Sequence, residues 1–318
     1  MSDPFASFRL SGRTALVTGA RREIGRAIAL GLAGAGARLA IHCAGTSDEL
    51  RDAASVVREI QSGGGEAAVF GQDFAQDDAG RRLAAAVSAW ASVDILVLNA
   101  SIELPEDFRA ISREHFDRQI AVNLRSTMEL LQELVPPMAE RGWGRVVSIG
   151  SVQQERPHPA MFVYAGTKAA QLNWALSLAR QFGGHGVTVN NLAPGAILTA
   201  RNREQMAVEG EALVQRIPAG RLGRPEDLVG AAMLLCSDAA AISTGPTSTS
   251  MAGAPQCRGT RSPAVAVPRR ASRAGCWADY RPVHRHRAYA TACLPGAIRQ
   301  PTTRYRSPQA DDGGQDTA

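Results

Sequence analysis

A regular alternation of short apolar runs with longer amphipathic segments constrains this chain more than any other feature. Six runs of five or six residues are typical of buried strands, at residues 14–18, 38–42, 66–71, 94–98, 145–149 and 187–192. Helix-like segments separate them, the clearest at residues 24–33, 48–62, 115–141 and 161–182. Strands that alternate with helices form a parallel sheet covered on both faces, with right-handed crossovers. We therefore predict a single-domain α/β protein with a doubly wound Rossmann sheet, whose ligand lies beyond the carboxyl ends of the strands.

Composition divides the chain in two near Gly245. After that residue the chain carries 11 Arg, no Lys and 4 Asp, a net charge of +7, whereas the residues up to Gly245 carry 24 basic and 26 acidic groups, a net charge of −2. The later part also holds 8 of the 17 prolines and no Glu. Such a segment buries too little apolar surface to offset its ordering entropy. We predict one folded domain over residues 1–245 and a disordered Arg/Pro-rich tail over residues 246–318.

Several classes of protein are disfavoured by what the sequence lacks. No apolar run approaches the ~20 residues of a membrane-spanning helix, and residues 1–12 lack the layout of a signal peptide. The five cysteines form no C-x-x-C pair, and the histidines show no metal-ligand spacing. No structured nucleic-acid-binding module accompanies the basic tail. We therefore expect a cytoplasmic protein with no metal site and no nucleic-acid or membrane partner.

The first strand leads into a turn with the sequence TGARREIG, at residues 18–25. A glycine-bearing turn between a strand and a helix lets backbone N–H groups approach a pyrophosphate at the helix N-terminus. The second strand ends in His-Cys-Ala-Gly at residues 42–45, with no acid to bond a ribose 2′-hydroxyl. Arg22 in the turn can instead pair with a 2′-phosphate. We therefore expect a bound dinucleotide, NADP in preference to NAD.

Tyr164 and Lys168 are the residues most specific for chemistry. They are four residues apart, so their side chains share one face of a helix. A phenol with a pKa of about 10 is a sluggish base at neutral pH, and a nearby ammonium stabilises the phenolate and lowers that pKa. Lys168 is the only lysine in the chain, against 34 arginines, and Tyr164 is the only tyrosine before the tail. Because arginine cannot act as a compact cation with an adjustable proton, a lysine at this one position favours a chemical role for the pair over a chance spacing.

Together these segments resemble the short-chain dehydrogenase/reductase family. The family pattern comprises T-G-x-x-x-G-x-G, N-A-G after the fourth strand, an Asn on the following long helix, a Ser, Y-x-x-x-K, and P-G after the sixth strand. The resemblance implies a catalytic set of Asn123, Ser151, Tyr164 and Lys168. It implies that Tyr164 transfers the proton, while Lys168 lowers the pKa of Tyr164 and bonds the nicotinamide ribose. Ser151 is expected to donate to the substrate oxygen, and Asn123 to hold a water that relays protons to Lys168.

The same resemblance implies a set of residues that contact the dinucleotide. These are Gly19, Arg21, Arg22, Ile24, Gly25, Asp73, Phe74, Asn99, Ala100, Tyr164, Lys168, Pro194, Gly195, Ile197 and Thr199. Two positions depart from the family pattern, because Glu23 replaces the middle glycine of the turn and Ser101 replaces the glycine of N-A-G. Three polar residues after the fifth strand, Gln153, Arg156 and His158, are candidates for the substrate pocket.

These features predict an NAD(P)-dependent oxidoreductase that interconverts a ketone and a secondary alcohol by hydride transfer, with Tyr164 as proton donor or acceptor. Length and layout are similar to 3-oxoacyl-carrier-protein reductases and sugar dehydrogenases. The family implies a homotetramer that the C-terminal strand helps to form, so a homo-oligomer is expected if that strand is present. The partner is expected to be a small carbonyl or alcohol substrate. A pteridine reductase-like enzyme is an alternative, because such members also fill the middle position of the turn. A non-catalytic dinucleotide-binding protein and an inactive truncated product are further alternatives.

The resemblance stops after Thr244-Gly245, where family members continue into a strand that ends in D-G-G. One permitted coding of residues 246–253, PTSTSMAG, becomes Ala-Asp-Ile-Asn-Val-Asp-Gly when a single G is added in front and the codons are regrouped. We therefore predict that the tail is out of frame, through loss of one base near Gly245. The sheet would then lack its final edge strand beside the sixth, and an unpaired strand edge favours aggregation. Resequencing the gene through this point tests the prediction.

Overall fold

Six parallel strands form one sheet in the computed structural model, which describes residues 3–245. The strands are β1 (Thr14–Val17), β2 (Arg38–Cys43), β3 (Ala67–Gly71), β4 (Ile95–Leu98), β5 (Gly144–Ile149) and β6 (Val187–Leu192). Their order is β3-β2-β1-β4-β5-β6, and every neighbouring pair is parallel. The predicted doubly wound Rossmann sheet is confirmed, with each strand within one residue of its expected limits. The order reverses between β1 and β4, the point at which such sheets bind ligands.

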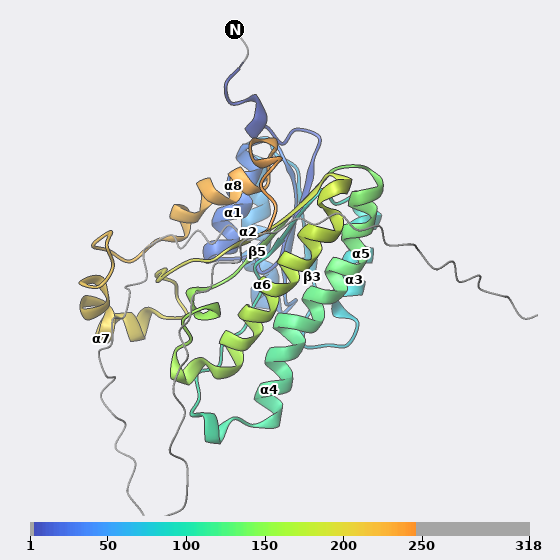
Figure 1. The fold of residues 1–318 in the computed structure, drawn as a ribbon. Coiled ribbons are helices and arrows are strands. Elements are labelled where there is room, and N and C mark those ends of the chain that lie inside the picture. The colour runs from blue at the N-terminus through green and yellow to red at the C-terminus, as the bar shows by residue number, and fades with distance from the viewer. Residues whose placement is uncertain (1–2, 246–318) are drawn as a thin grey trace, which may run out of the picture. The chain divides into compact units, whose positions relative to one another are not determined.

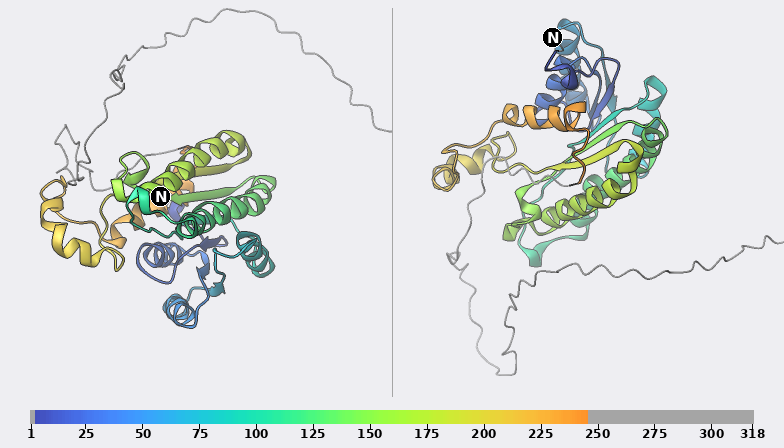
Figure 2. Two further views of the ribbon diagram at one scale, coloured as in Figure 1. Left: turned by 90° about the horizontal axis from the view of Figure 1, so that it is seen from below. Right: turned by 45° about the horizontal axis from the view of Figure 1, so that its top comes forward.

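Two layers of helices cover the sheet (Figures 1 and 2). One face carries α1 (Glu23–Gly34), α2 (Ser47–Ser62) and α8 (Val229–Leu235), and the other carries α3 (Ala79–Trp90), α5 (Ser126–Glu140) and α6 (Phe162–Phe182). Two shorter helices are α4 (Arg113–Ile120) and α7 (Arg203–Val214), of which α7 stands apart from both layers (Figure 1). Short 3-10 helices occur at Ala6–Phe8, Phe108–Ala110, Val152–Gln154, Pro159–Met161, Gly183–His185, Pro225–Leu228 and Asp238–Ala240.

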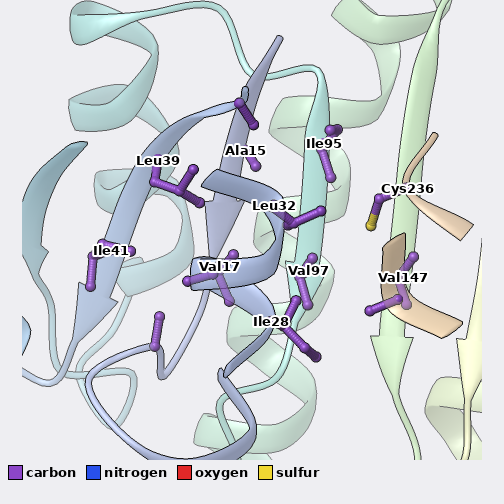
Figure 3. Close-up of a cluster of buried hydrophobic side chains, with 14 of the residues drawn as sticks. Ala15, Val17, Ile28, Leu32, Leu39, Ile41, Ile95, Val97, Val147 and Cys236 are labelled. Carbon is purple, nitrogen blue, oxygen red and sulfur yellow. The ribbon is translucent and has the colours of Figure 1, made fainter. Parts of the chain in front are cut away.

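The strands are apolar along their whole length because both of their faces are buried. In β1, Ala15 and Val17 point into the core shared with α1, α2 and α8, whereas Leu16 points into the core shared with α3, α5 and α6. Figure 3 shows the first of these cores, where Ile28 and Leu32 of α1 pack against side chains from β1, β2 and β4. Continuous burial of this kind explains why unbroken apolar runs located the strands so closely.

The helix expected at residues 115–141 differs from the prediction, because a π-helical turn at Ala121–Arg125 separates α4 from α5. Two hydroxyls stabilise this wide turn: Ser126 Oγ donates to the carbonyl of Val122 at 2.7 Å, and Thr127 Oγ1 donates to that of Asn123 at 2.9 Å. Such turns are rare and frequently occur at functional sites. The widened turn contains Asn123, one of the residues expected to be catalytic.

The last described residues lie along β6. Gly245 N donates to the carbonyl of Val189 at 3.0 Å, and Val189 N donates to the hydroxyl of Thr244 at 3.1 Å. In the part of the sheet that the structure describes, β5 is the only strand paired with β6. The predicted disordered tail, the reading-frame change and the missing edge strand all concern residues 246–318, which lie outside the described residues.

From the sequence we expected neither a membrane-spanning helix nor a metal site, and residues 3–245 bear on both expectations. Within residues 3–245 no helix combines the length and apolarity needed to cross a bilayer. The described residues also contain no group of three or more His, Cys, Asp and Glu side chains placed to hold a metal ion.

Candidate active site

A cavity of about 870 Å³ lies at the carboxyl ends of the strands. The residues expected to contact a dinucleotide all line it, from Gly19 in the turn after β1 to Thr199 after β6. Ser151, Tyr164 and Lys168 line it too, whereas Asn123 is fully buried and is not part of the lining. Gln153 and His158 face the same cavity, but Arg156 does not belong to its lining. The structure thus gathers segments from across the sequence into one site.

The glycines of the turn after β1 are required by close packing. Gly19 has a φ of +64°, in the left-handed region that favours glycine. A Cβ on Gly25 would lie 2.4 Å from the carbonyl oxygen of Gly19 and 2.6 Å from Asn99 Nδ2. Asn99 Nδ2 in turn donates to the carbonyls of Thr18 and Gly19, at 2.8 and 3.1 Å. Asn99, directly after β4, therefore holds the turn in place. The glycines of the turn leave its backbone uncovered by side chains at the N-terminus of α1.

His42 supports the same turn from β2, a role that was not predicted from the sequence. Gly19 N donates to His42 Nδ1 at 3.1 Å, and Nε2 contacts the carbonyl oxygen of Gln72 at 2.9 Å. Because burial lowers the pKa of His42 to about 4, the ring is neutral at physiological pH, with Nδ1 accepting and Nε2 donating. The ring also stacks on Phe74, with centroids 4.3 Å apart. The signal available in the sequence for this role was a histidine near the end of the strand that follows the glycine turn.

Asp73 and the two arginines occupy the same end of the cavity. The Asp73 carboxylate accepts a bond from Ala75 N at 2.9 Å, so it shapes its own turn. Arg21 is committed to acids of α2, with Glu49 at 3.2 Å and Asp52 at 2.7 Å. Arg22, by contrast, is exposed and has no ion pair among residues 3–245. Arg22 is therefore the cation available to a ligand at this end.

Glu23, the unusual residue of the turn, adopts the left-handed conformation with a φ of +51°. A non-glycine residue in this conformation costs roughly 1–2 kcal/mol. Its Oε1 accepts a hydrogen bond of 2.9 Å from Ala200 N, in the segment after β6. The next residue, Arg201, donates to the carbonyl of Ser101 at 2.7 Å and lies 3.8 Å from Glu103. Residues 200 and 201 therefore connect the turn after β1 to the loop after β4, both of which line the cavity.

The segment after β6 is held by a network of its own. Pro194 O accepts from Val152 N at 3.1 Å, which ties the segment to the loop after β5. Ile197 forms an isolated parallel bridge with Gly223. The hydroxyl of Thr199 donates to Asn202 Oδ1 at 3.3 Å, so it is directed along the segment. These contacts hold the backbone of the segment along the cavity, which Pro194, Gly195, Ile197 and Thr199 all line.

Ser151, Tyr164 and Lys168 meet at the other end of the cavity. Ser151 follows β5 and begins a 3-10 helix, accepting a bond from Gln153 N at 3.2 Å. Tyr164 and Lys168 lie on α6 and are both buried. Lys168 Nζ is 5.7 Å from the centre of the Tyr164 ring and donates to the carbonyl of Ile149 at 2.7 Å. The last carbonyl of β5 thus fixes the ammonium beside the phenol.

Burial changes the acidity of both groups. It raises the pKa of Tyr164 to about 12, with Glu103 adding to the rise and Arg201 and a hydrogen bond with Ser151 opposing it. It lowers the pKa of Lys168 to about 7, with Arg201 adding to the fall. The lowered phenol pKa expected from the sequence is therefore wrong for the chain alone, because loss of water around Tyr164 outweighs its neighbours. The ammonium, in contrast, titrates near neutral pH.

Asn123 lies behind this pair, and its side chain spans two elements. Oδ1 accepts from Ile102 N at 2.9 Å, while Nδ2 donates to the carbonyl of Ile102 at 2.9 Å and to Thr167 Oγ1 at 3.1 Å. The carbonyl of Asn123 accepts from Gln171 Nε2 at 2.6 Å, and Gln171 Oε1 accepts from Lys168 Nζ at 3.1 Å. A glutamine amide therefore connects Asn123 to Lys168, and the expected water between them stays a prediction. Gln171 follows Lys168 by three residues, a spacing that could have revealed it.

Comparisons with known proteins identify the family. A profile described as short chain dehydrogenase matches residues 13–209. L-rhamnose 1-dehydrogenase (NAD(P)(+)) from Azotobacter vinelandii is 37% identical over 240 residues, which cover 74% of this chain and 94% of that protein. Gluconate 5-dehydrogenase from Gluconobacter oxydans is 36% identical, covering 75% and 93%. The crystal structure of a 3-oxoacyl (acyl-carrier-protein) reductase from Agrobacterium tumefaciens with NADP bound is 43% identical, with a TM-score of 0.73 and coverage of 78% and 96%.

The chain therefore belongs to the short-chain dehydrogenase/reductase family, as its motifs predicted. These relatives are dehydrogenases and reductases, and the match to this chain extends over nearly their full length. The expectation that the chain is an oxidoreductase of this family is therefore confirmed.

Proposed function

We propose that this protein interconverts a ketone and a secondary alcohol, using NADP in preference to NAD. One observation carries the proposal: the only lysine of the chain lies beside Tyr164, in the wall of a cavity whose other end is a glycine turn at a helix N-terminus. The turn suits phosphates, and the buried pair suits proton transfer. A single cavity of about 870 Å³ is large enough to hold a dinucleotide with a small substrate.

The residues present fit a dinucleotide. Gly19 and Gly25 leave the backbone open at the N-terminus of α1, where even one added Cβ on Gly25 would clash. Arg22 is available for a 2′-phosphate, which supports NADP, and the similar reductase from Agrobacterium tumefaciens holds NADP. Phe74, Ala100, Pro194 and Gly195 would complete the walls. When bound, the nicotinamide supplies or accepts a hydride.

The chain's own groups would manage the proton and the substrate oxygen. The Ser151 hydroxyl, hydrogen bonded to Tyr164, would donate to the carbonyl oxygen and orient it. In the reducing direction, the Tyr164 hydroxyl would protonate the developing alkoxide, and the Lys168 ammonium would stabilise the phenolate left behind. In the oxidising direction the same atoms would act in reverse.

A screen of ketones and alcohols, following NADPH and NADH absorbance, tests this proposal. We expect turnover with at least one small carbonyl substrate and a lower KM for NADPH than for NADH. Tyr164→Phe should lower kcat by at least about 10²-fold, because general acid–base catalysis contributes this much or more, while dinucleotide binding persists. Full turnover in the phenylalanine variant, or no affinity for either nucleotide, would contradict the proposal.

The relatives also bear on the alternatives. None of the three relatives described above is a pteridine reductase, and two of them act, by name, on sugars or sugar acids. We therefore place small polyols and sugar acids first in the screen. A non-catalytic role is disfavoured because Ser151, Tyr164 and Lys168 all line the cavity that would hold the dinucleotide.

We further propose that the protein is a homo-oligomer, as the family resemblance implied, and that it acts in the cytoplasm. Four large apolar side chains of neighbouring elements are exposed, Phe108, Phe116, Met128 and Phe162. Phe108 and Phe162 pack edge to face with centroids 5.1 Å apart. Exposed apolar groups of this kind support association. Light scattering after size-exclusion chromatography of the full chain tests the proposal, and a monomer would contradict it.

A further inference from the structure

Gln171 lies directly behind the proposed reaction centre. It follows Tyr164 by seven residues and Lys168 by three, so the three side chains share one face of α6. Gln171 is only 3% exposed. Its Oε1 accepts from Lys168 Nζ at 3.1 Å, and its Nε2 donates to the carbonyl of Asn123 at 2.6 Å and to Thr127 Oγ1 at 3.3 Å. One amide therefore joins the ammonium to the π-helical turn.

The chemistry of the partners fixes the orientation of this amide. An ammonium can only donate and a backbone carbonyl can only accept, so the oxygen must face Lys168 and the nitrogen must face Asn123. The Thr127 hydroxyl donates to the same Asn123 carbonyl, which leaves its lone pairs to accept from Gln171. Every bond in the group is consistent with the others, which favours a single rigid arrangement.

The position of the Gln171 amide has two consequences for the Lys168 ammonium. It offers Lys168 a neutral acceptor, and no acid forms an ion pair with Lys168 among residues 3–245. Two charged groups from other elements act on the pKa of Lys168 through space: Arg201 lowers it and Glu103 raises it, and these two lie 3.8 Å from each other. Unlike a carboxylate, a carboxamide neither gains nor loses a proton in the working pH range, and unlike a water it does not relay one. The two hydrogen bonds of Lys168, to Ile149 and Gln171, use two of its three donors. The third is left for the cavity that Lys168 lines.

We propose that Gln171 is a positioning residue for the proton-transfer pair. It holds the Lys168 ammonium beside Tyr164 without a counter-charge, and it closes the route from Lys168 toward Asn123, so protons exchange through the cavity. This inference rests on the proposed oxidoreductase function. It assigns to an amide the place that the family resemblance gave to a water.

The single lysine makes the test specific. In protein labelled with ¹³Cε-lysine, one NMR signal reports the ionisation of Lys168 in the full chain. Gln171→Glu places a carboxylate beside the ammonium, and we expect the midpoint of the lysine titration to rise by at least about one pH unit. Gln171→Leu removes the acceptor, and the midpoint should fall below that of the wild type. Gln181→Leu, an exposed position of the same helix, is the control and should leave the midpoint unchanged.

Kinetics provide the second readout. We expect Gln171→Leu to lower kcat about tenfold or more, the loss that follows from one charge-assisted hydrogen bond, with KM changed less than about twofold. Gln171→Ala should retain more activity than Gln171→Leu, because the smaller side chain leaves room for a water between Lys168 and Asn123. In Gln171→Glu the pH profile of kcat should move in the alkaline direction with the lysine midpoint.

The outcomes separate the two proposals. If the lysine midpoint is the same in the wild type and in the Glu and Leu variants, the role of Gln171 is wrong, whatever the activity. If the wild type turns over no substrate with either nucleotide, the proposed function fails while the NMR result still decides the role of Gln171. Should the Leu variant not fold, Gln171→Met keeps the length, loses all three side-chain hydrogen bonds and is expected to show the same fall in midpoint and kcat.

Discussion

Two buried cations lie at opposite ends of the same strand, and they differ in what surrounds them. Arg145 is the second residue of β5 and is 3% exposed. Its guanidinium donates to Asp238 Oδ1 at 2.8 Å and to the carbonyl of Ser237 at 3.1 Å. It also stacks on the Trp143 ring at 4.3 Å. Lys168, at 2% exposed, reaches the end of β5 and bonds only neutral groups.

Burial acts in the same direction on both cations but leads to different states. It lowers the pKa of Arg145, yet Asp238 opposes the fall and a guanidinium stays charged at any working pH. It lowers the pKa of Lys168 to about 7, where the proton can be released and regained. The comparison teaches that a paired cation in this protein supports the fold, whereas an unpaired one is available for chemistry.

Removing each cation gives the sharpest contrast. We expect Lys168→Met to lower kcat by about 10³-fold, within the range that general acid–base groups contribute, and to leave the free energy of unfolding unchanged or higher. The reason is that a buried ammonium without a counter-charge costs desolvation energy. Steady-state kinetics and urea denaturation measure the two effects. If Lys168→Met were strongly destabilised, this lysine would stabilise the fold as Arg145 does, which would contradict the account.

Arg145→Met should produce the opposite pattern. We expect it to lower the free energy of unfolding by about 3 kcal/mol, because it leaves Asp238 and buried carbonyls without their partner. The exposed side of Asp238 keeps the loss from being larger. The kcat per folded molecule should stay within a few-fold of the wild type. Loss of turnover in a well-folded Arg145→Met protein would contradict the claim that Arg145 supports only the fold.

The dependence of stability on pH separates the two cations again. Between about pH 7 and 9 the unfolded chain binds a proton at Lys168 that the folded chain lacks, so stability rises with pH in this window. Above pH 9 the raised pKa of the buried Cys236 thiol acts in the opposite direction. A single group like Lys168 contributes about 1.4 kcal/mol per pH unit. The contribution levels off below pH 7, where both states are protonated. Denaturation at a series of pH values should show this slope in the wild type and in Arg145→Met, and its absence in Lys168→Met.

The smallest expected effect concerns strain near the phosphate end of the site. Glu23→Gly should raise the free energy of unfolding by up to about 1 kcal/mol, because glycine relieves the left-handed backbone at the cost of the Ala200 hydrogen bond. Removing the carboxylate should also strengthen dinucleotide binding a few-fold, measured by fluorescence titration. Glu23→Gln keeps the hydrogen-bond acceptor and is the matched control for charge. Weaker binding in Glu23→Gly would show that the contact with Ala200 matters more than the charge.

The sequence predicted the strands closely because each is buried on both faces and therefore apolar throughout. It could not predict the π-helical turn, since that depends on two hydroxyls that bond carbonyls four residues earlier. His42 was missed because it meets Gly19 only when β1 and β2 pair. The pKa of Tyr164 was expected to fall, because the sequence shows its charged neighbour but not the extent of its burial. The placement of the predicted catalytic residues agrees with the motif, and their roles stay predictions.

The central claim is that Lys168 is a buried cation without a counter-charge, and one titration tests it directly. Full-length protein labelled with ¹³Cε-lysine gives a single signal, because the chain has one lysine. We expect that signal to titrate near pH 7, the value to which burial lowers its pKa. A midpoint close to 10.5, the ordinary value for lysine, would contradict the account.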